Sequence, residues 1–163
     1  MKAKGSEETI GLPTHVPNSN PHLHHPAVTL PHLRDLDEEF PGWWRGTQTP
    51  IDTPQTVRVA EIVGSASGSG WQFLPDWKPV EPTEPRFEQV LHSIRERGFD
   101  PAFDGSPIEL IKFQGEYWVA DGHRRVSAAA MLGIGYVRAE ITVLEFTSPP
   151  QRKTRIENMD VTE

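Results

Sequence analysis

Five consecutive residues, DGHRR at positions 121–125, bring together a carboxylate, a glycine, an imidazole and two guanidinium groups. They stand between the apolar stretch EYWVA and the alanine-rich stretch VSAAAML. The first stretch is typical of a strand and the second of a helix, which places the five residues at a strand-to-helix turn. The first N–H groups of a helix have no partner within it, and arginine matches the geometry of phosphate oxygens. The segment therefore predicts a phosphate-binding corner.

Each residue of this corner has a possible task. Gly122 would let a phosphate oxygen approach the backbone and would permit a positive φ. Helical spacing puts His123, Arg124 and Ser127 on one face, where the Ser127 hydroxyl could donate to the same ligand. Either Arg124 or Arg125 could form the bidentate pair that phosphate favours. These residues are the predicted binding set.

A plainer interpretation of the same residues needs no ligand. Asp121 could cap the helix, His123 could be a surface imidazole, and the two arginines could be solvated. However, basic residues in the first turn oppose the helix dipole. Two adjacent arginines there are unfavourable unless an anion compensates them, which favours the functional interpretation.

The elements that must position the corner are marked by apolar spacing and by turn residues. The stretch TVRVAEIVG (56–64) predicts a short strand running into a turn, and the glycine-rich GSASGSG (64–70) predicts a loop. This loop is not a P-loop, because Trp71 follows its last glycine where a P-loop has lysine. A helix is expected between Thr83 and Gly98, with apolar residues at helical spacing, namely Phe87, Val90, Leu91 and Ile94.

The chain around the corner predicts three further elements. PIELIKF (107–113) and EYWVA (116–120) read as antiparallel strands joined by a tight turn at Gln114 and Gly115. Gly133 ends the alanine-rich helix, and YVRAEITVLEF (136–146) forms a final strand. The expected fold is α+β, a small mixed sheet with packed helices, over residues 55–147.

The two ends of the chain are expected to be arm and tail. Residues 1–54 hold eight of the sixteen prolines and predict a largely irregular arm, with one helical turn around Leu36. Trp43 and Trp44 should bury against the home domain or, as the alternative, against a protein partner. The H-x-H-H segment of this arm predicts adventitious metal binding at most, through His22, His24 and His25. Residues 148–163 predict a charged, frayed tail.

Composition narrows the classes of function. Sixteen Lys and Arg against 23 Asp and Glu give a net charge of -7, which disfavours nucleic acid as a partner. The chain has no cysteine, which excludes disulfides and thiolate chemistry and agrees with a reducing compartment. No apolar run suggests a signal peptide or a membrane span. We therefore expect a soluble, cytoplasmic protein.

The run from PIELIKF through YWVADGHRRVSAAAMLGIGYVRAEI also resembles the core of the ParB and sulfiredoxin-like superfamily. Members of that superfamily share a G-x-R/H-R signature that opens a helix after a strand. The resemblance covers roughly residues 56–146. It implies that Gly122, His123, Arg124 and Arg125 contact nucleotide phosphates, as the matching positions do for CTP in ParB-type clamps and for ATP in sulfiredoxins and free-serine kinases. The segment D-G-H is closer to the small-molecule kinase and stand-alone branches.

The chain departs from two branches of this superfamily. Sulfiredoxins carry a cysteine in this turn, where the present chain has Gly122, so sulfinic-acid reduction is excluded. Partition proteins continue into a helix-turn-helix domain, whereas a short charged tail follows here, so a partition or nuclease role is disfavoured. Paired carboxylates at metal-site spacing are also lacking, and no metal ligand is assigned.

Two functions remain open on the sequence. One is an ATP-dependent phosphotransferase acting on a small hydroxylated molecule, which would need Mg²⁺ and a carboxylate to accept the proton. The candidate carboxylates are Asp121, which adjoins the corner, and Glu61 and Glu109, for which a solvated strand-end position is the simpler expectation. The other is a non-catalytic module that senses ATP or CTP and binds a protein partner.

Overall fold

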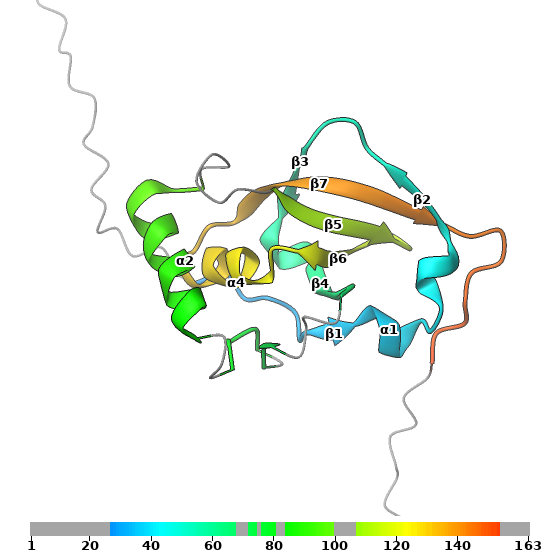
Figure 1. Cartoon of the computed structure of the whole chain (residues 1–163), viewed down its shortest axis with the longest axis horizontal. Coiled ribbons are helices and arrows are strands. Elements are labelled where there is room, and N and C mark those ends of the chain that lie inside the picture. The colour runs from blue at the N-terminus through cyan, green and yellow to red at the C-terminus, as the bar shows by residue number, and fades with distance from the viewer. Residues whose placement is uncertain (1–26, 68–71, 75, 81–83, 100–106, 154–163) are drawn as a thin grey trace, which may run out of the picture.

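The computed structural model describes residues 27–67, 72–74, 76–80, 84–99 and 107–153. These residues form an α+β fold built on a seven-stranded mixed sheet (Figure 1). The strands are β1 (Arg34–Asp35), β2 (Thr47–Pro50), β3 (Gln55–Arg58), β4 (Ile62–Ser65), β5 (Ile108–Phe113), β6 (Glu116–Asp121) and β7 (Tyr136–Glu145). The helices are α1 (Leu36–Glu39), α2 (Glu84–Arg97) and α4 (His123–Met131), with 3-10 turns η1 (Trp43–Arg45) and η2 (Val59–Glu61).

The strand order of the sheet is β1-β4-β6-β5-β7-β2, with β3 also paired to β7. The pairs β1/β4, β4/β6 and β5/β7 are parallel, and β5/β6, β2/β7 and β3/β7 are antiparallel. Both β2 and β3 lie along the same side of the long strand β7, one on each half of it. The strands β5 and β6 form the expected hairpin, whose turn residues Gln114 and Gly115 have positive φ of 50° and 79°.

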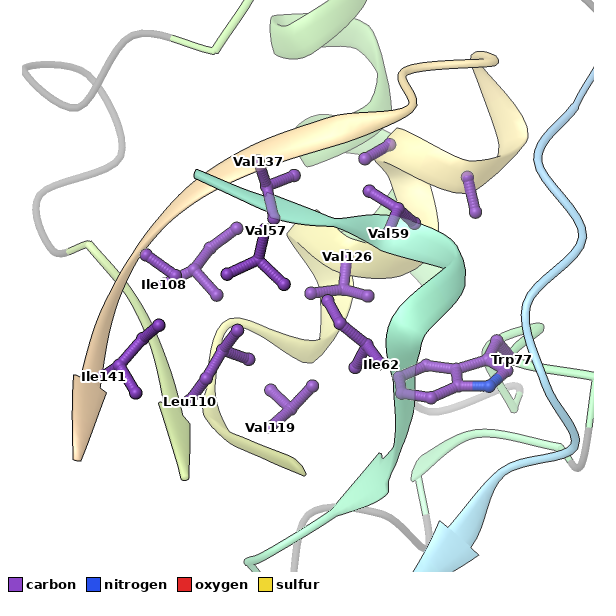
Figure 2. Packing of buried hydrophobic residues seen from close by; sticks show 13 residues of the cluster. Val57, Val59, Ile62, Trp77, Ile108, Leu110, Val119, Val126, Val137 and Ile141 are labelled. Atoms are coloured by element: carbon purple, nitrogen blue, oxygen red, sulfur yellow. The ribbon is translucent and has the colours of Figure 1, made fainter. Parts of the chain in front are cut away.

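One face of the sheet is covered by α4, and α2 packs on the outside of α4 (Figure 1). Alternate residues of β7 (Val137, Ala139 and Ile141) point into this layer, as expected for a strand with one buried face. Val126 and Ala129 of α4 meet them in the main core (Figure 2). The small side chains of the Ala128–Ala130 run let the helix lie close both to the sheet and to Phe87 of α2.

The opposite face of the sheet is covered over part of its area by the segment of α1 and η1. Leu36, Phe40 and Trp43 pack there against Phe113 and Trp118. The rings of Phe40 and Phe113 meet edge to face, with centroids 5.0 Å apart. The segment before residue 54 thus supplies a second core cluster.

The expectation of an irregular arm up to residue 54 was wrong for the part that the structure describes. Residues 34–35 pair with β4, and residues 47–50 pair with β7, so this segment belongs to the sheet. Strands this short are too brief to show an alternating pattern of apolar residues. Their pairing could not be predicted either, because the partner strands lie far away in the sequence. Trp43 is buried in the home domain, as expected, whereas Trp44 is 56% exposed.

The short strand running into a turn that was expected over residues 56–64 is confirmed by β3 and η2, but the second strand that follows, β4, was not predicted. The chain forms β3, turns through η2 and continues as β4, so the two halves pair with different strands. The start of the expected tail is held as well, since the Lys153 N–H donates to the Glu39 carbonyl at 2.8 Å. Three of the arm's histidines (His22, His24 and His25), Trp71 and residues 154–163 lie outside the described residues.

None of the helices in the described ranges combines the length and the apolar composition that a bilayer crossing requires.

Candidate functional site

The corner between β6 and α4 has the backbone that the DGHRR segment predicts. Gly122 is the residue that precedes the helix, in the left-handed conformation with φ 103° and ψ 22°. A Cβ at this position would lie 3.1 Å from Ile108 Cγ1 and 3.2 Å from Arg125 Nη2. Glycine is therefore required both by the backbone angle and by the space. Because glycine has no side chain, no side-chain cap satisfies the first N–H groups, and the plainer idea of Asp121 as the cap was wrong.

Arg124 lies in the first turn of α4, and the described residues around it offer little negative charge or hydrogen bonding to compensate its guanidinium. Its Nη2 donates to Gln72 Oε1 at 3.1 Å, a neutral amide oxygen. Its Nε is buried and has no hydrogen-bond partner within the described ranges of the chain. The helix has no acidic residue in this turn. Arg124 is thus a cation near a positive helix end, with donor capacity left over.

Arg125 is held more firmly by the protein. Its Nη2 donates to the Pro107 carbonyl at 3.3 Å and lies 3.5 Å from Asp121 Oδ2. The side chain of Arg125 is 11% exposed, whereas that of Asp121 is 59% exposed. Arg125 therefore ties the end of β6 to the start of β5, and it is less available to a ligand than Arg124.

His123 points inward and not to solvent. It is buried, its Nε2 lies 2.7 Å from Ser65 Oγ at the end of β4, and its ring stacks on Phe73 with a centroid distance of 6.0 Å. Burial lowers the pKa of His123 from its ordinary value of 6.5 to about 4, with Asp121 raising it and Arg124 lowering it further. The imidazole is thus neutral at physiological pH, and the plainer idea of a surface imidazole was wrong.

The Ser127 hydroxyl is not available to donate to a ligand beside Arg124, contrary to the expectation from helical spacing. It is buried, and its hydroxyl donates to the Trp77 carbonyl at 2.6 Å. Trp77 has a positive φ of 67°, is almost fully buried, and donates from Nε1 to the Pro31 carbonyl at 2.8 Å. Ser127 therefore fastens the segment around Trp77 to α4.

The structure separates the candidate carboxylates. Glu109 is the Cα partner of Asp121 in the β5–β6 pair, so two carboxylate residues are neighbours at the corner. Glu61 precedes Ile62, which pairs with Tyr117, four residues before Asp121 on β6. The sheet therefore brings Glu109 to the corner and leaves Glu61 away from it. Both Glu109 and Glu61 are exposed.

Two other observations concern metal binding and the position of a surface depression. Across the described ranges of the chain, no group of three or more His, Asp or Glu side chains is arranged to hold a metal ion. An open depression of about 500 Å³ lies elsewhere, between the hairpin turn of β5 and β6 and the C-terminal end of β7, and is lined by residues such as Gln114 and Phe146. It shares no lining residue with the corner, and we place the candidate site at the corner, where the charge lies.

Two residues at the corner were not identified from the sequence, namely Ser65 and Gln72. They stand 58 and 52 positions before their partners His123 and Arg124. The available signal was the position of Ser65 in the glycine-rich segment and of Gln72 just after it, and no local motif connects this segment to DGHRR.

Comparison of the chain with protein-family models, with curated proteins and with solved structures gives no match. The resemblance to the ParB and sulfiredoxin-like superfamily therefore stays a prediction from the DGHRR segment and its neighbouring elements.

Proposed function

We propose that the chain binds a nucleotide through its phosphates at the corner between β6 and α4, in a ParB/sulfiredoxin-like domain. The observation that carries this proposal is the state of Arg124. Among the described residues, its guanidinium stands in the first turn of an uncapped helix with one neutral partner and a buried Nε that has no partner. An anion at the first N–H groups of the helix would compensate this cation, and a shift of the side chain would let the buried Nε donate to it as well.

The chemistry of the ligand follows from the donors at the corner. A guanidinium beside helix N–H groups suits a group with several oxygens and negative charge, and a phosphate chain fits this description. The resemblance of DGHRR to the superfamily signature favours ATP or CTP as the source of the phosphates. Such nucleotides fit the cytoplasmic location that we expect for a chain without cysteine.

A phosphotransferase is the catalytic form of this proposal. It is favoured by the pairing of Glu109 with Asp121, which puts two carboxylates next to the phosphate corner. One of them could accept the proton of a hydroxylated acceptor. Glu61 is not part of this proposal, because the register of β4 places it away from Asp121.

A non-catalytic nucleotide sensor is the alternative form. Trp44 favours it, because this residue is 56% exposed and lies in a segment attached directly to the sheet. In such a module, nucleotide at the corner would alter binding of a protein partner.

The test of the proposal is calorimetric titration of ATP and CTP into the full chain, each with and without Mg²⁺. We expect saturable binding of at least one nucleotide. Absence of binding by both, in both conditions, would contradict the proposal. Magnesium-dependent formation of ADP in the presence of small hydroxylated acceptors would then separate the phosphotransferase from the sensor.

A further inference from the structure

His123 makes a chain of short contacts that the proposed phosphate contact does not explain. Its Nε2 lies 2.7 Å from Ser65 Oγ, and Ser65 Oγ lies 2.7 Å from the Ser67 carbonyl oxygen. The Ser67 N–H also donates to Ser65 Oγ, at 3.2 Å. The imidazole is thus fastened to the turn that follows β4.

Counting protons fixes the direction of these hydrogen bonds. The Ser65 hydroxyl has one proton, and the Ser67 carbonyl has none. At 2.7 Å the two oxygens attract each other only if the Ser65 proton lies between them. His123 Nε2 must then be the donor to Ser65 Oγ. The arrangement selects the tautomer of His123 that carries its proton on Nε2.

A face of the same ring stacks on Phe73, the residue that follows Gln72. The planes of the His123 and Phe73 rings differ by 21°, with stacked centroids. Gln72, adjacent to Phe73, accepts a hydrogen bond from Arg124. Residues 65–67 and residues 72–73 therefore both rest on the first turn of α4, through His123 and Arg124.

We infer that His123 is a positioning residue and not a phosphate ligand: its neutral ring donates from Nε2 to Ser65 and stacks on Phe73, so that Gln72 orients the Arg124 guanidinium. As far as it concerns a phosphate, this inference rests on the proposed function. It differs from the role that the superfamily resemblance implies for His123, which is direct contact with the nucleotide.

The surroundings of the ring agree with a neutral imidazole. The elements packed against it contribute uncharged groups, the Ser65 hydroxyl from β4 and the Phe73 ring. The charged groups that act on it are Asp121 and Arg124, which oppose each other, and burial is the dominant influence. Among the described residues, no carboxylate contacts the ring to hold it protonated.

The first test uses the full chain without nucleotide. Nitrogen NMR of the imidazole rings from pH 8 to pH 5 should show one histidine of the seven that stays in the Nε2–H form, and His123→Gln should remove that signal. The Nδ1–H form at His123, or a titration near its ordinary pKa, would overturn the inference.

The second test separates positioning from a merely structural role. Glutamine at position 123 keeps an N–H donor at similar reach, whereas leucine has none. We expect the Arg124 Nε–H signal to stay protected from exchange in His123→Gln and to lose protection in His123→Leu. ATP affinity should be close to that of the wild type in the first variant and about tenfold weaker in the second. Equal protection of Arg124 in both variants would overturn the positioning role.

The state of the ring with nucleotide bound completes the test. If His123 is a positioning residue, saturating ATP leaves its ring neutral, while conversion to the imidazolium would overturn the inference. Should the wild type bind neither ATP nor CTP, the proposed function fails, and the Arg124 exchange measurement still decides whether His123 positions that side chain. Ser65→Ala serves as a second variant if His123→Leu does not fold, with loss of Arg124 Nε–H protection as the expected result.

Discussion

Arg34 in β1 and Arg124 in α4 occupy opposite electrostatic settings. Arg34 makes two hydrogen bonds of 2.6 Å to the Glu39 carboxylate and two, of 2.8 and 3.2 Å, to that of Glu116. Its guanidinium also lies 4.8 Å from the centre of the Trp118 ring. Glu39, first, and then Glu116 raise the pKa of Arg34 above its ordinary value, against the effect of burial. Among the described residues, Arg124 has a single hydrogen-bond partner, the amide oxygen of Gln72.

The difference separates a cation used for stability from one left for a ligand. The cluster of Arg34, Glu39, Glu116 and Arg152, here called the clasp, joins β1, α1, the start of β6 and the C-terminal segment. The three guanidinium nitrogens of Arg34 all donate within the protein. At the corner, by contrast, the Nε donor of Arg124 has no acceptor among the described residues, which is an arrangement expected of a binding site.

Acid should break the corner and the clasp at different pH. The folded-state pKa of His123 is lowered to about 4 by burial, so the unfolded chain binds its proton first. The stability contributed by neutral His123 is complete above its ordinary pKa of 6.5 and is lost as the pH falls toward 4, a loss of about 3 kcal/mol. Urea unfolding across this range should show the loss in the wild type and not in His123→Gln. Equal pH dependence of the unfolding free energy in both proteins would contradict this contribution of His123.

The clasp should weaken only in stronger acid. Hydrogen bonding from Arg34 lowers the pKa of Glu39 below its ordinary value of 4.5. The stability contributed by this carboxylate is therefore complete above about 4.5 and is lost as the pH falls through the lower folded-state value. Hydrogen exchange near pH 5 should accordingly show opening of the corner before opening of β1 and α1.

Removal of Arg34 tests the clasp itself. Arg34→Met removes the cation that both Glu39 and Glu116 contact and leaves only Arg152 of the clasp beside Glu39, and we expect the free energy of unfolding to fall by about 2 kcal/mol. The matched control is Arg152→Met, which removes one ion pair from an exposed side chain and should cost under about 0.5 kcal/mol. Nucleotide affinity should change in neither variant. A loss of affinity in Arg34→Met at a temperature where it remains folded would break the distinction between the two regions.

Gly122 tests the geometry of the corner. Gly122→Ala forces alanine into the left-handed region and against Ile108, at a cost of about 2 kcal/mol. Gly115→Ala is the control, because Gly115 also has a positive φ but a Cβ there meets no atom within 4 Å. It should cost about 1 kcal/mol. Thermal unfolding of both variants measures the difference, and equal costs would show that crowding at the corner is absent.

The parts of the fold that local patterns specify were predicted from the sequence, and those set by distant pairing were not. The apolar spacing of α2 and the turn residues of the β5–β6 hairpin are local signals, and both elements are confirmed. By contrast, β1 is two residues long and exists through its pairing with Gly64 and Ser65 of β4. No window of sequence reports such a contact.

The candidate site shows the same division. The segment DGHRR predicts the turn, and Gly122 has the expected positive φ. The partners of its side chains could not be predicted, because helical spacing places Ser127 beside Arg124 but does not reveal the Trp77 carbonyl that the hydroxyl contacts. Nor does any spacing reveal that Glu109 lies opposite Asp121, which depends on a register shift in the hairpin.

Arg124 itself should matter least for stability and most for binding. Arg124→Ala removes an uncompensated cation and one hydrogen bond to an amide, so the free energy of unfolding should change by under about 0.5 kcal/mol. Arg95→Ala, an exposed arginine of α2, is the matched control.

The most direct measurement is calorimetric titration of Mg-ATP and Mg-CTP into the wild type, Arg124→Ala and Arg95→Ala at pH 7.5 and low salt. We predict that the wild type and Arg95→Ala bind one of these nucleotides with equal affinity, and that Arg124→Ala binds it at least about tenfold more weakly while remaining folded. Equal affinity in all three proteins, or no binding by the wild type, would contradict the assignment of the corner as a nucleotide-phosphate site.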